Sequence, residues 1–211
     1  MLPVNMPTPP SPNSSPAEQT KLVRQRRALN RLLQVLQRGM CSKVVNDLAS
    51  FVLKEAHNMS ALLSILKHPE SYPKIQIQKA AWVAHRAFQA DSRGLLGHRQ
   101  AFSQILDATE DPSVMREILK VLANPVWLDI ENESMRADLL QLALDLLHLP
   151  HFPIAVHYAA LQIIQTRATT KAEEIESLAA IRVLMDEQQK QNSLYRCAAK
   201  HETRILQKIR R

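Results

Sequence analysis

The feature that most constrains the fold of this chain is a proline-marked repeat in its second half. Pro73, Pro112 and Pro153 open three segments, separated by 39 and 41 residues, that read YPKIQIQKAAWVAHRA, DPSVMREILKVLA and FPIAVHYAALQIIQ. Proline is favoured in the first turn of a helix, because the N–H that it lacks would have no partner there. Each segment therefore predicts a helix that begins at its proline.

A second amphipathic helix is expected after each of these. Apolar residues recur at helical spacing over about 92–108, 134–148 and 171–188, with Ile175 among the core positions of the last one. A further helix over about 193–210 closes the series. One such pair cannot cover its own apolar face, so neighbouring pairs must stack.

The period near 40 residues is typical of HEAT or armadillo repeats. The predicted fold is therefore all-α: a HEAT/armadillo-like α-α superhelix, which is a right-handed solenoid of antiparallel helix pairs. An irregular helical bundle, in which the spacing of the prolines is accidental, is the alternative. We expect a single helical domain over 17–211, made of N-terminal capping helices (17–67), repeats (73–190) and a C-terminal capping helix (193–211).

The N-terminal region predicts a tail followed by three helices. Residues 1–16 hold six of the twelve prolines, and such a segment neither sustains helical hydrogen bonding nor buries enough apolar area to offset its ordering entropy, so disorder is expected there. Leu22 opens a row of apolar residues at helical spacing that predicts a first helix ending at Gly39. Ser42 and Asn58 are placed to cap the second and third helices.

Composition favours helices and argues against several classes of protein. Aromatic residues make up 4% of the chain and there are three glycines, whereas sheets favour aromatic residues and need glycine at hairpin turns. Cys41 and Cys197 have no disulfide or metal spacing, which indicates a reducing compartment. Neither a secretory signal nor a run of ~20 apolar residues is present, so we expect a cytoplasmic protein without a membrane span.

The formal net charge of +7 comes from the two ends of the chain. Residues 1–40 carry a net +5 and residues 190–211 a net +6, while the segment between them carries −4. An electrostatic partner is therefore expected to meet the termini. Arg24, Arg27 and Arg31 are candidate contacts to nucleic acid or anionic lipid; a solvated outer face on a capping helix is the alternative.

Parts of the chain resemble two known protein families. The stretches KIQIQKAAWVAHRAF, DPSVMREILKVL and PIAVHYAALQII resemble a family of small HEAT-like proteins of Bacteroidetes, over about residues 60–211. That likeness implies a fold and no activity, because the family has no established role. More distantly, the chain is similar to the HEAT-like alkylpurine DNA glycosylases, in which aromatic side chains and a carboxylate face a basic groove. Trp82, Trp127 and Asp129 supply these residue types without a shared motif, and the resemblance implies that they contact nucleic acid.

The charges of the paired helices argue against a glycosylase-like groove. The first helices of the pairs carry six Lys or Arg and one acid, Glu117, while the second helices carry five basic and eight acidic residues. If the second helices line the concave side, that side is acidic and disfavours duplex DNA, since phosphate contacts dominate affinity. Trp82 and Trp127 are then packing residues, and Asp129 a solvated or capping group.

No motif indicates catalysis. The chain lacks a GxSxG elbow and a glycine-rich phosphate loop, and His148, His151 and His157 straddle a helix end without matching ligand spacing. We therefore expect no catalytic, cofactor-binding or metal-binding residue and no cofactor. The predicted function is a non-enzymatic interaction module that binds a protein or peptide partner on its solenoid surface. The alternatives are a nucleic-acid-binding or DNA-repair protein that uses the basic terminal helices, and an enzyme whose site assembles only in three dimensions.

Overall fold

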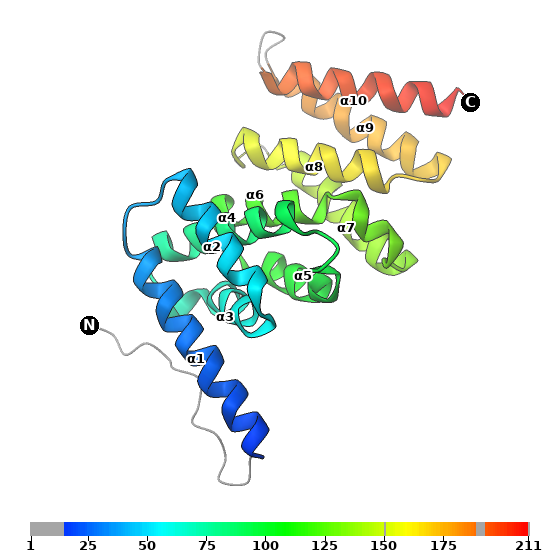
Figure 1. Cartoon of the computed structure of the whole chain (residues 1–211). Helices are drawn as coiled ribbons and strands as arrows, with labels where there is room; N and C mark the ends of the chain where they lie inside the picture. The colour runs from blue at the N-terminus through cyan, green and yellow to red at the C-terminus, as the bar shows by residue number, and fades with distance from the viewer. Residues whose placement is uncertain (1–14, 150, 189–192, 211) are drawn as a thin grey trace. The chain divides into compact units, whose positions relative to one another are not determined.

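The computed structural model describes residues 15–149, 151–188 and 193–210, and all of its regular secondary structure within these residues is helical (Figure 1). The elements are α1 (Pro16–Leu36), α2 (Ser42–Lys54), α3 (Ala56–Lys67), η1 (Pro69–Ser71), α4 (Lys74–Ala90), η2 (Leu96–His98), α5 (Arg99–Ala108), α6 (Pro112–Leu122), η3 (Pro125–Asp129), α7 (Glu133–Leu147), α8 (Ile154–Arg167), α9 (Lys171–Glu187) and α10 (Ser193–Ile209), where η marks a short 3-10 helix. The predicted all-α class is confirmed. None of the helices in the described ranges is long and apolar enough to cross a membrane.

The chain divides into two compact units, Met1–Ile118 and Leu119–Arg211, and the boundary falls inside α6. The single domain expected over 17–211 stays a prediction.

In the first unit, helices that are two apart in the chain lie side by side. α1 packs against α3 and α3 against α5, while α2 packs against α4; hydrogen bonds tie α4 to the start of α6. Contacts of α3 with α2 and α4 join the two rows. Phe88 and Phe102 meet edge to face in the core, with ring centroids 6.3 Å apart, which is the arrangement that the aromatic quadrupole favours.

The second unit repeats this arrangement on a smaller scale. α7 packs against α8 and α9, and α10 packs against α8 and α9. The loop between α6 and α7 contributes Trp127, which is fully buried and donates its indole N–H to the carbonyl of Val121 at 2.7 Å. A buried indole needs such an acceptor, because an unpaired N–H in an apolar core is costly.

A buried ion pair joins α8 to that same loop. The Arg167 side chain is fully buried, and its Nε lies 2.8 Å from Oε2 of Glu131, whose side chain is 1% exposed. Nη2 of Arg167 also donates to the carbonyl oxygens of Leu122, at 2.9 Å, and Asn124, at 3.3 Å. These bonds fix the segment that carries the buried tryptophan.

A second arginine, Arg136 of α7, connects α7 to the start of α9. Its guanidinium donates to Glu133, to Glu173 at 2.6 Å and to the carbonyl oxygen of Arg167. These hydrogen bonds favour the charged carboxylate, and with the backbone N–H groups of Thr169 and Thr170 they lower the pKa of Glu173 to about 2.

The first helix begins inside the segment predicted to be a tail. Ser15 caps α1 by accepting the N–H of Glu18 at 3.3 Å, and the Glu18 carboxylate accepts the N–H of Ser15 at 2.8 Å. Pro16 occupies the first helical position. The predicted tail is therefore wrong for its last two residues, and its residues 1–14 lie outside the described residues. The helix ends at Leu36, earlier than predicted.

The two predicted caps of the next helices are wrong. Cys41 is the N-cap residue of α2, without a side-chain cap, and Ser42 is the first helical residue. α3 begins at Ala56, so Asn58 lies within the helix. Its side chain is buried, and Nδ2 donates to the carbonyl of Phe51 at 2.8 Å. A carbonyl near the end of α2 has no partner within its own helix, and Asn58 satisfies it.

The three repeat prolines begin helices as predicted. Pro73 and Pro153 immediately precede α4 and α8, and Pro112 is the first residue of α6. The helix expected over 92–108 is shorter, because a turn in which Asp91 accepts the N–H of Gly94 at 2.8 Å occupies its start.

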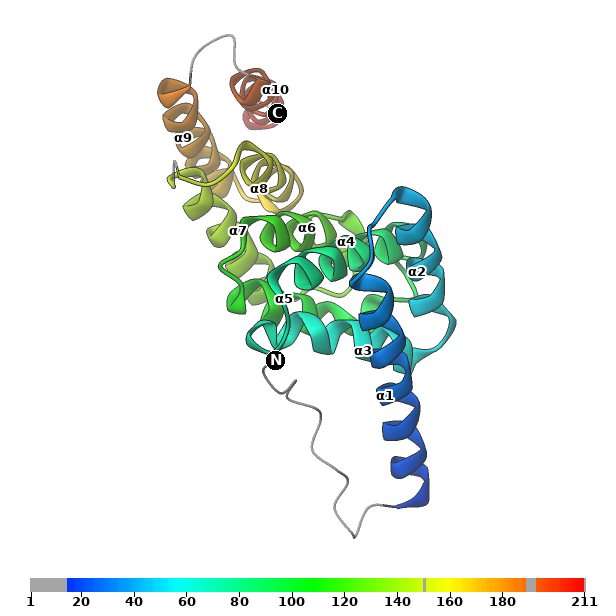
Figure 2. The same ribbon diagram turned by 90° about the vertical axis from the view of Figure 1, so that its left-hand side faces the viewer.

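Two residues expected to face the core are exposed. The Leu22 side chain is on the half of α1 that extends past the other helices of its unit, and Figures 1 and 2 both show this extension. Ile175 of α9 is 54% exposed. Both expectations were wrong because helical spacing identifies a face and does not show how far along the helix a neighbour reaches.

Candidate binding groove

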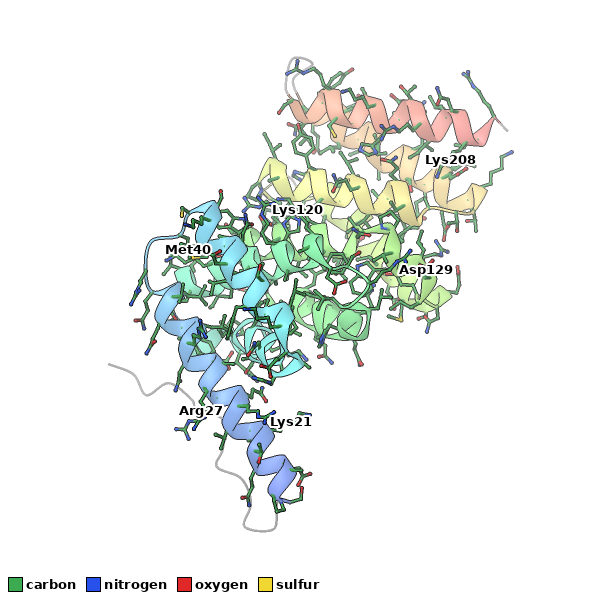
Figure 3. The ribbon with its side chains drawn as sticks, in the orientation of Figure 1. Lys21, Arg27, Met40, Lys120, Asp129 and Lys208 are labelled. Carbon is green, nitrogen blue, oxygen red and sulfur yellow. The ribbon has the colours of Figure 1, made fainter. Side chains whose placement is uncertain are left out.

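A groove on the first unit, with a volume of about 520 Å³, is a candidate binding site. It is lined by the α1–α2 loop, one face of α4 and the first turns of α6: Gly39, Met40, Ile75, Gln78, Lys79, Trp82, Ser113, Arg116 and Glu117. Figure 3 labels Met40 in that loop. We call this site the Trp82 groove.

Three apolar side chains form the walls of the Trp82 groove. Met40 and Trp82 are half-buried, and Ile75 is 55% exposed. Ile75 and Trp82 are seven positions apart on α4, so they lie on the same face of the helix. An exposed isoleucine beside a half-exposed indole leaves apolar surface accessible to a ligand.

Lys79 closes one end of the groove by holding the end of α1. Its ammonium donates to the carbonyl oxygens of Leu36, at 2.8 Å, and Arg38, at 2.6 Å. The last carbonyls of a helix have no partner within the helix and carry partial negative charge. A lysine ammonium there supplies both a hydrogen-bond donor and a positive charge. Lys79 therefore shapes the groove.

A buried carboxylate lies at the α6 side of the groove. The Glu117 side chain is 5% exposed, and its two oxygens lie 2.6 Å from Nδ1 of His85 and 2.7 Å from Nε of Arg116. Two nitrogen partners offset the cost of burying this charge. Arg116 itself is 39% exposed, so it presents a cation at the rim.

Asp111 fixes the start of α6 against α4. Burial alone would raise its pKa, but Gln78 and Lys74 donate to the carboxylate, at 2.9 and 3.1 Å, and so do the N–H groups of Ser113 and Val114. The hydrogen bonds outweigh burial and lower the pKa of Asp111. Both acids beside the groove thus have partners from α4 or α6.

The Trp82 groove suits binding better than bond-making. Its acids hold the helices together, and His85, which contacts Glu117, is not among the lining residues. The described residues contain no group of three or more His, Cys, Asp or Glu arranged to hold a metal ion. What the groove offers a ligand is apolar area and a cationic rim.

The residues singled out from the sequence lie in different surroundings. Trp82 lines the groove, whereas Trp127 is fully buried and Asp129 is exposed at the end of η3. The three candidate arginines are all exposed on α1: Arg24, Arg27 and Arg31.

Sequence analysis did not find the other groove residues. Met40, Ile75 and Arg116 come from three separate segments, and no local pattern shows that these segments meet. One signal was present: Ile75 and Trp82 share a helical face with Gln78 and Lys79, which mixes apolar and polar residues on one face of α4.

Comparisons with protein-family models, with curated proteins and with solved structures each gave no match. The resemblances to the HEAT-like family of Bacteroidetes and to the alkylpurine DNA glycosylases therefore stay predictions.

Proposed function

We propose that the protein is a non-enzymatic interaction module whose Trp82 groove binds an acidic, amphipathic segment of a protein partner. The observation that carries this proposal is the groove itself, in which Trp82, Met40 and Ile75 present apolar area beside an exposed guanidinium. Aromatic residues, methionine and arginine are the residues enriched in the cores of protein interfaces. Methionine also adapts to different partner side chains.

The charges around the groove determine the chemistry of the partner. Glu117 and Asp111 are engaged by cations of the same unit. Arg116 lines the groove and is 39% exposed, so it presents the cation at the rim. A segment with leucine or aromatic side chains flanked by carboxylates would complement both the apolar walls and this rim.

We also propose that the helices belong to a HEAT/armadillo-like α-α superhelix. In each unit, helices two apart in the chain lie in the same row, as stacked helix pairs require. The three prolines begin α4, α6 and α8 at a nearly constant spacing, which supports a repeat. Experimental coordinates of the whole chain in which those helices did not stack in sequence order would exclude this fold.

The experiment for the groove is selection of peptides on the whole chain. A phage-displayed library of random 16-residue peptides is selected on the wild type, and the enriched peptides are synthesised. Their affinities are then measured by the emission of Trp82, since the other tryptophan, Trp127, is fully buried. We expect acid-rich peptides with large apolar side chains, and a change in emission that the Trp82→Phe variant lacks.

Two matched variants decide whether the groove is the binding site. Ile75→Glu places a negative charge in the groove and should lower the affinity for the peptides at least tenfold. Ile75→Lys should lower that affinity less. Ile175→Glu is the control, because Ile175 on α9 is equally exposed, at 54% against 55%. Peptides without acidic residues, or equal losses in Ile75→Glu and Ile175→Glu, would overturn the proposal, as would a selection that enriches nothing.

The alternative of a base-excision protein has less support from the described residues. A base stacks on an exposed aromatic face, and Trp127 is enclosed in the core.

A further inference from the structure

We propose that the exposed half of α1, together with the hollow beside it, binds the phosphate backbone of a nucleic acid. This surface lies apart from the Trp82 groove and does not depend on the function proposed for it. We call it the α1 basic surface, and its residues are Lys21, Arg24, Arg27 and Arg31 with the hollow next to Arg24.

The N-terminal half of α1 contains no buried residue. The buried residues of α1 begin only at Ala28, although the helix starts at Pro16. The capping box of Ser15 and Glu18 satisfies the first N–H groups, which stabilises a helix end independently of packing. Eleven of the twelve residues from Pro16 to Arg27 are exposed and Gln25 is half-buried, and both ribbon views show the start of α1 extending past the other helices of its unit (Figures 1 and 2).

Cations dominate this exposed half. Lys21, Arg24, Arg27 and Arg31 are all exposed, and their spacing of three, three and four spreads them along about 15 Å of one broad side of the helix. Figure 3 shows Lys21 and Arg27 on opposite edges of that side. The only acid in α1 is Glu18, whose carboxylate is engaged by the cap. A polyanion would therefore meet cations without a competing carboxylate from this helix.

A hollow deepens this surface where α1 passes the α2–α3 turn. It has a volume of about 430 Å³ and is lined by Ala17, Thr20, Lys21, Arg24, Glu55, Ala56 and His57. Its one acid, Glu55, lies 3.2 Å from Nδ1 of His57. The hollow is large enough for a phosphate group and part of its sugar, with Lys21 and Arg24 at its edge.

Arg31 is held in place at the other end of the surface. Its guanidinium lies over the ring of Phe51, 4.6 Å from the centroid. Stacking on an aromatic face leaves the N–H groups at the edges of the guanidinium plane, where they suit two oxygens of one phosphate. The arginine is therefore oriented before a ligand arrives.

The apolar residues of this half favour nucleic acid over a membrane. Leu22 and Val23 are 37% and 50% exposed, but consecutive residues of a helix point about 100° apart. A helix that lies in a membrane surface needs a continuous apolar face. The continuous apolar face of α1 lies in its second half, where Ala28, Leu29, Leu32 and Leu36 are buried in the core.

The test is fluorescence anisotropy of labelled U20 RNA and of a labelled 20-base-pair DNA duplex with the whole chain, from 25 to 200 mM KCl. Four phosphate contacts predict a slope of log affinity against log salt near −3.6 for the duplex and near −2.8 for the single strand, from about −0.9 and −0.7 per contact. The two ligands thereby distinguish a double strand from a single strand as the source of the phosphates.

The decisive variant is Arg24→Gln/Arg27→Gln/Arg31→Gln, which should lose at least tenfold in affinity at 25 mM KCl. Its control removes three exposed cations elsewhere and has the same net charge: Lys54→Gln/Arg93→Gln/Lys171→Gln. Because Arg31 also contacts Phe51, the double variant Arg24→Gln/Arg27→Gln is measured too, with circular dichroism of each protein.

Three results would overturn the proposal. The first is an equal loss of affinity in the control variant, the second an affinity that does not depend on salt, and the third an absence of binding to either nucleic acid at 25 mM KCl. Phosphatidylserine vesicles or a polyglutamate peptide that displaced the RNA at equal charge would show a general anion surface instead. Ile75→Glu should leave nucleic-acid binding unchanged, so failure of either proposal is separate from failure of the other.

Discussion

Replacing Arg167 with methionine tests how the second unit is held together. The substitution keeps most of the side-chain volume and removes the charge. Glu131 would then be left 1% exposed without the guanidinium that lies 2.8 Å away. The carbonyls of Leu122 and Asn124 would lose a donor as well.

The expected loss follows from burial. Removing one partner of a buried ion pair costs about 3–5 kcal/mol, because the remaining charge stays buried without its counter-ion. The unpaired carbonyl groups add to this loss. A domain of ordinary stability has about 5–15 kcal/mol in total, so Arg167→Met should bring the second unit close to unfolding in water.

The assay is urea unfolding followed by the emission of Trp127, in a Trp82→Phe background so that this buried indole is the only tryptophan. With a slope of about 1–3 kcal/mol per molar urea, the midpoint should fall by roughly 2 M. A second variant, Arg167→Met with Glu131→Leu, should recover part of the loss, since no unpaired charge then stays buried.

The control is the exposed pair of Arg182 and Glu202, whose nitrogen and oxygen also lie 2.8 Å apart. Arg182 is 55% exposed, and solvent screening limits such a pair to about 0–1 kcal/mol. If Arg167→Met cost less than 1 kcal/mol, or no more than Arg182→Met, the inference from burial to stability would be refuted.

Two further predictions concern single buried groups. Burial lowers the pKa of both His157 and His201 below the usual 6.5. The unfolded chain then binds more protons than the folded one, so the stability should be full above pH 6.5 and fall as the pH drops below it. Replacing both histidines by Gln should flatten a plot of urea midpoint against pH from 7 to 5. Asn58→Ala leaves a carbonyl of α2 without its donor at 2.8 Å, which should cost about 1–3 kcal/mol of stability, measured by thermal unfolding. The same change at the exposed Asn30 should cost less than about 0.5 kcal/mol. Equal losses at the two asparagines would contradict this reasoning.

The sequence by itself determined the helices. Proline at positions 73, 112 and 153 marks three helix starts, and apolar residues at helical spacing placed most of the others within a few residues, whereas α5 begins at Arg99 and not near residue 92. Both signals are local, because the missing N–H of proline and the 3.6-residue period act within one helix. The cap at Asn58 was predicted wrongly because a polar residue near a helix start can serve a carbonyl of another helix instead. Ser42 is the first residue of α2 and Cys41 precedes it as the N-cap residue.

Only the tertiary structure decided which surfaces stay open. The Trp82 groove combines residues near positions 40, 75–82 and 113–117, and the first half of α1 is exposed because it meets only the start of α3. The partner of Arg167 is likewise 36 residues away along the chain. Contacts between distant segments depend on how helices stack, and the spacing of residues within one helix carries no information about that stacking.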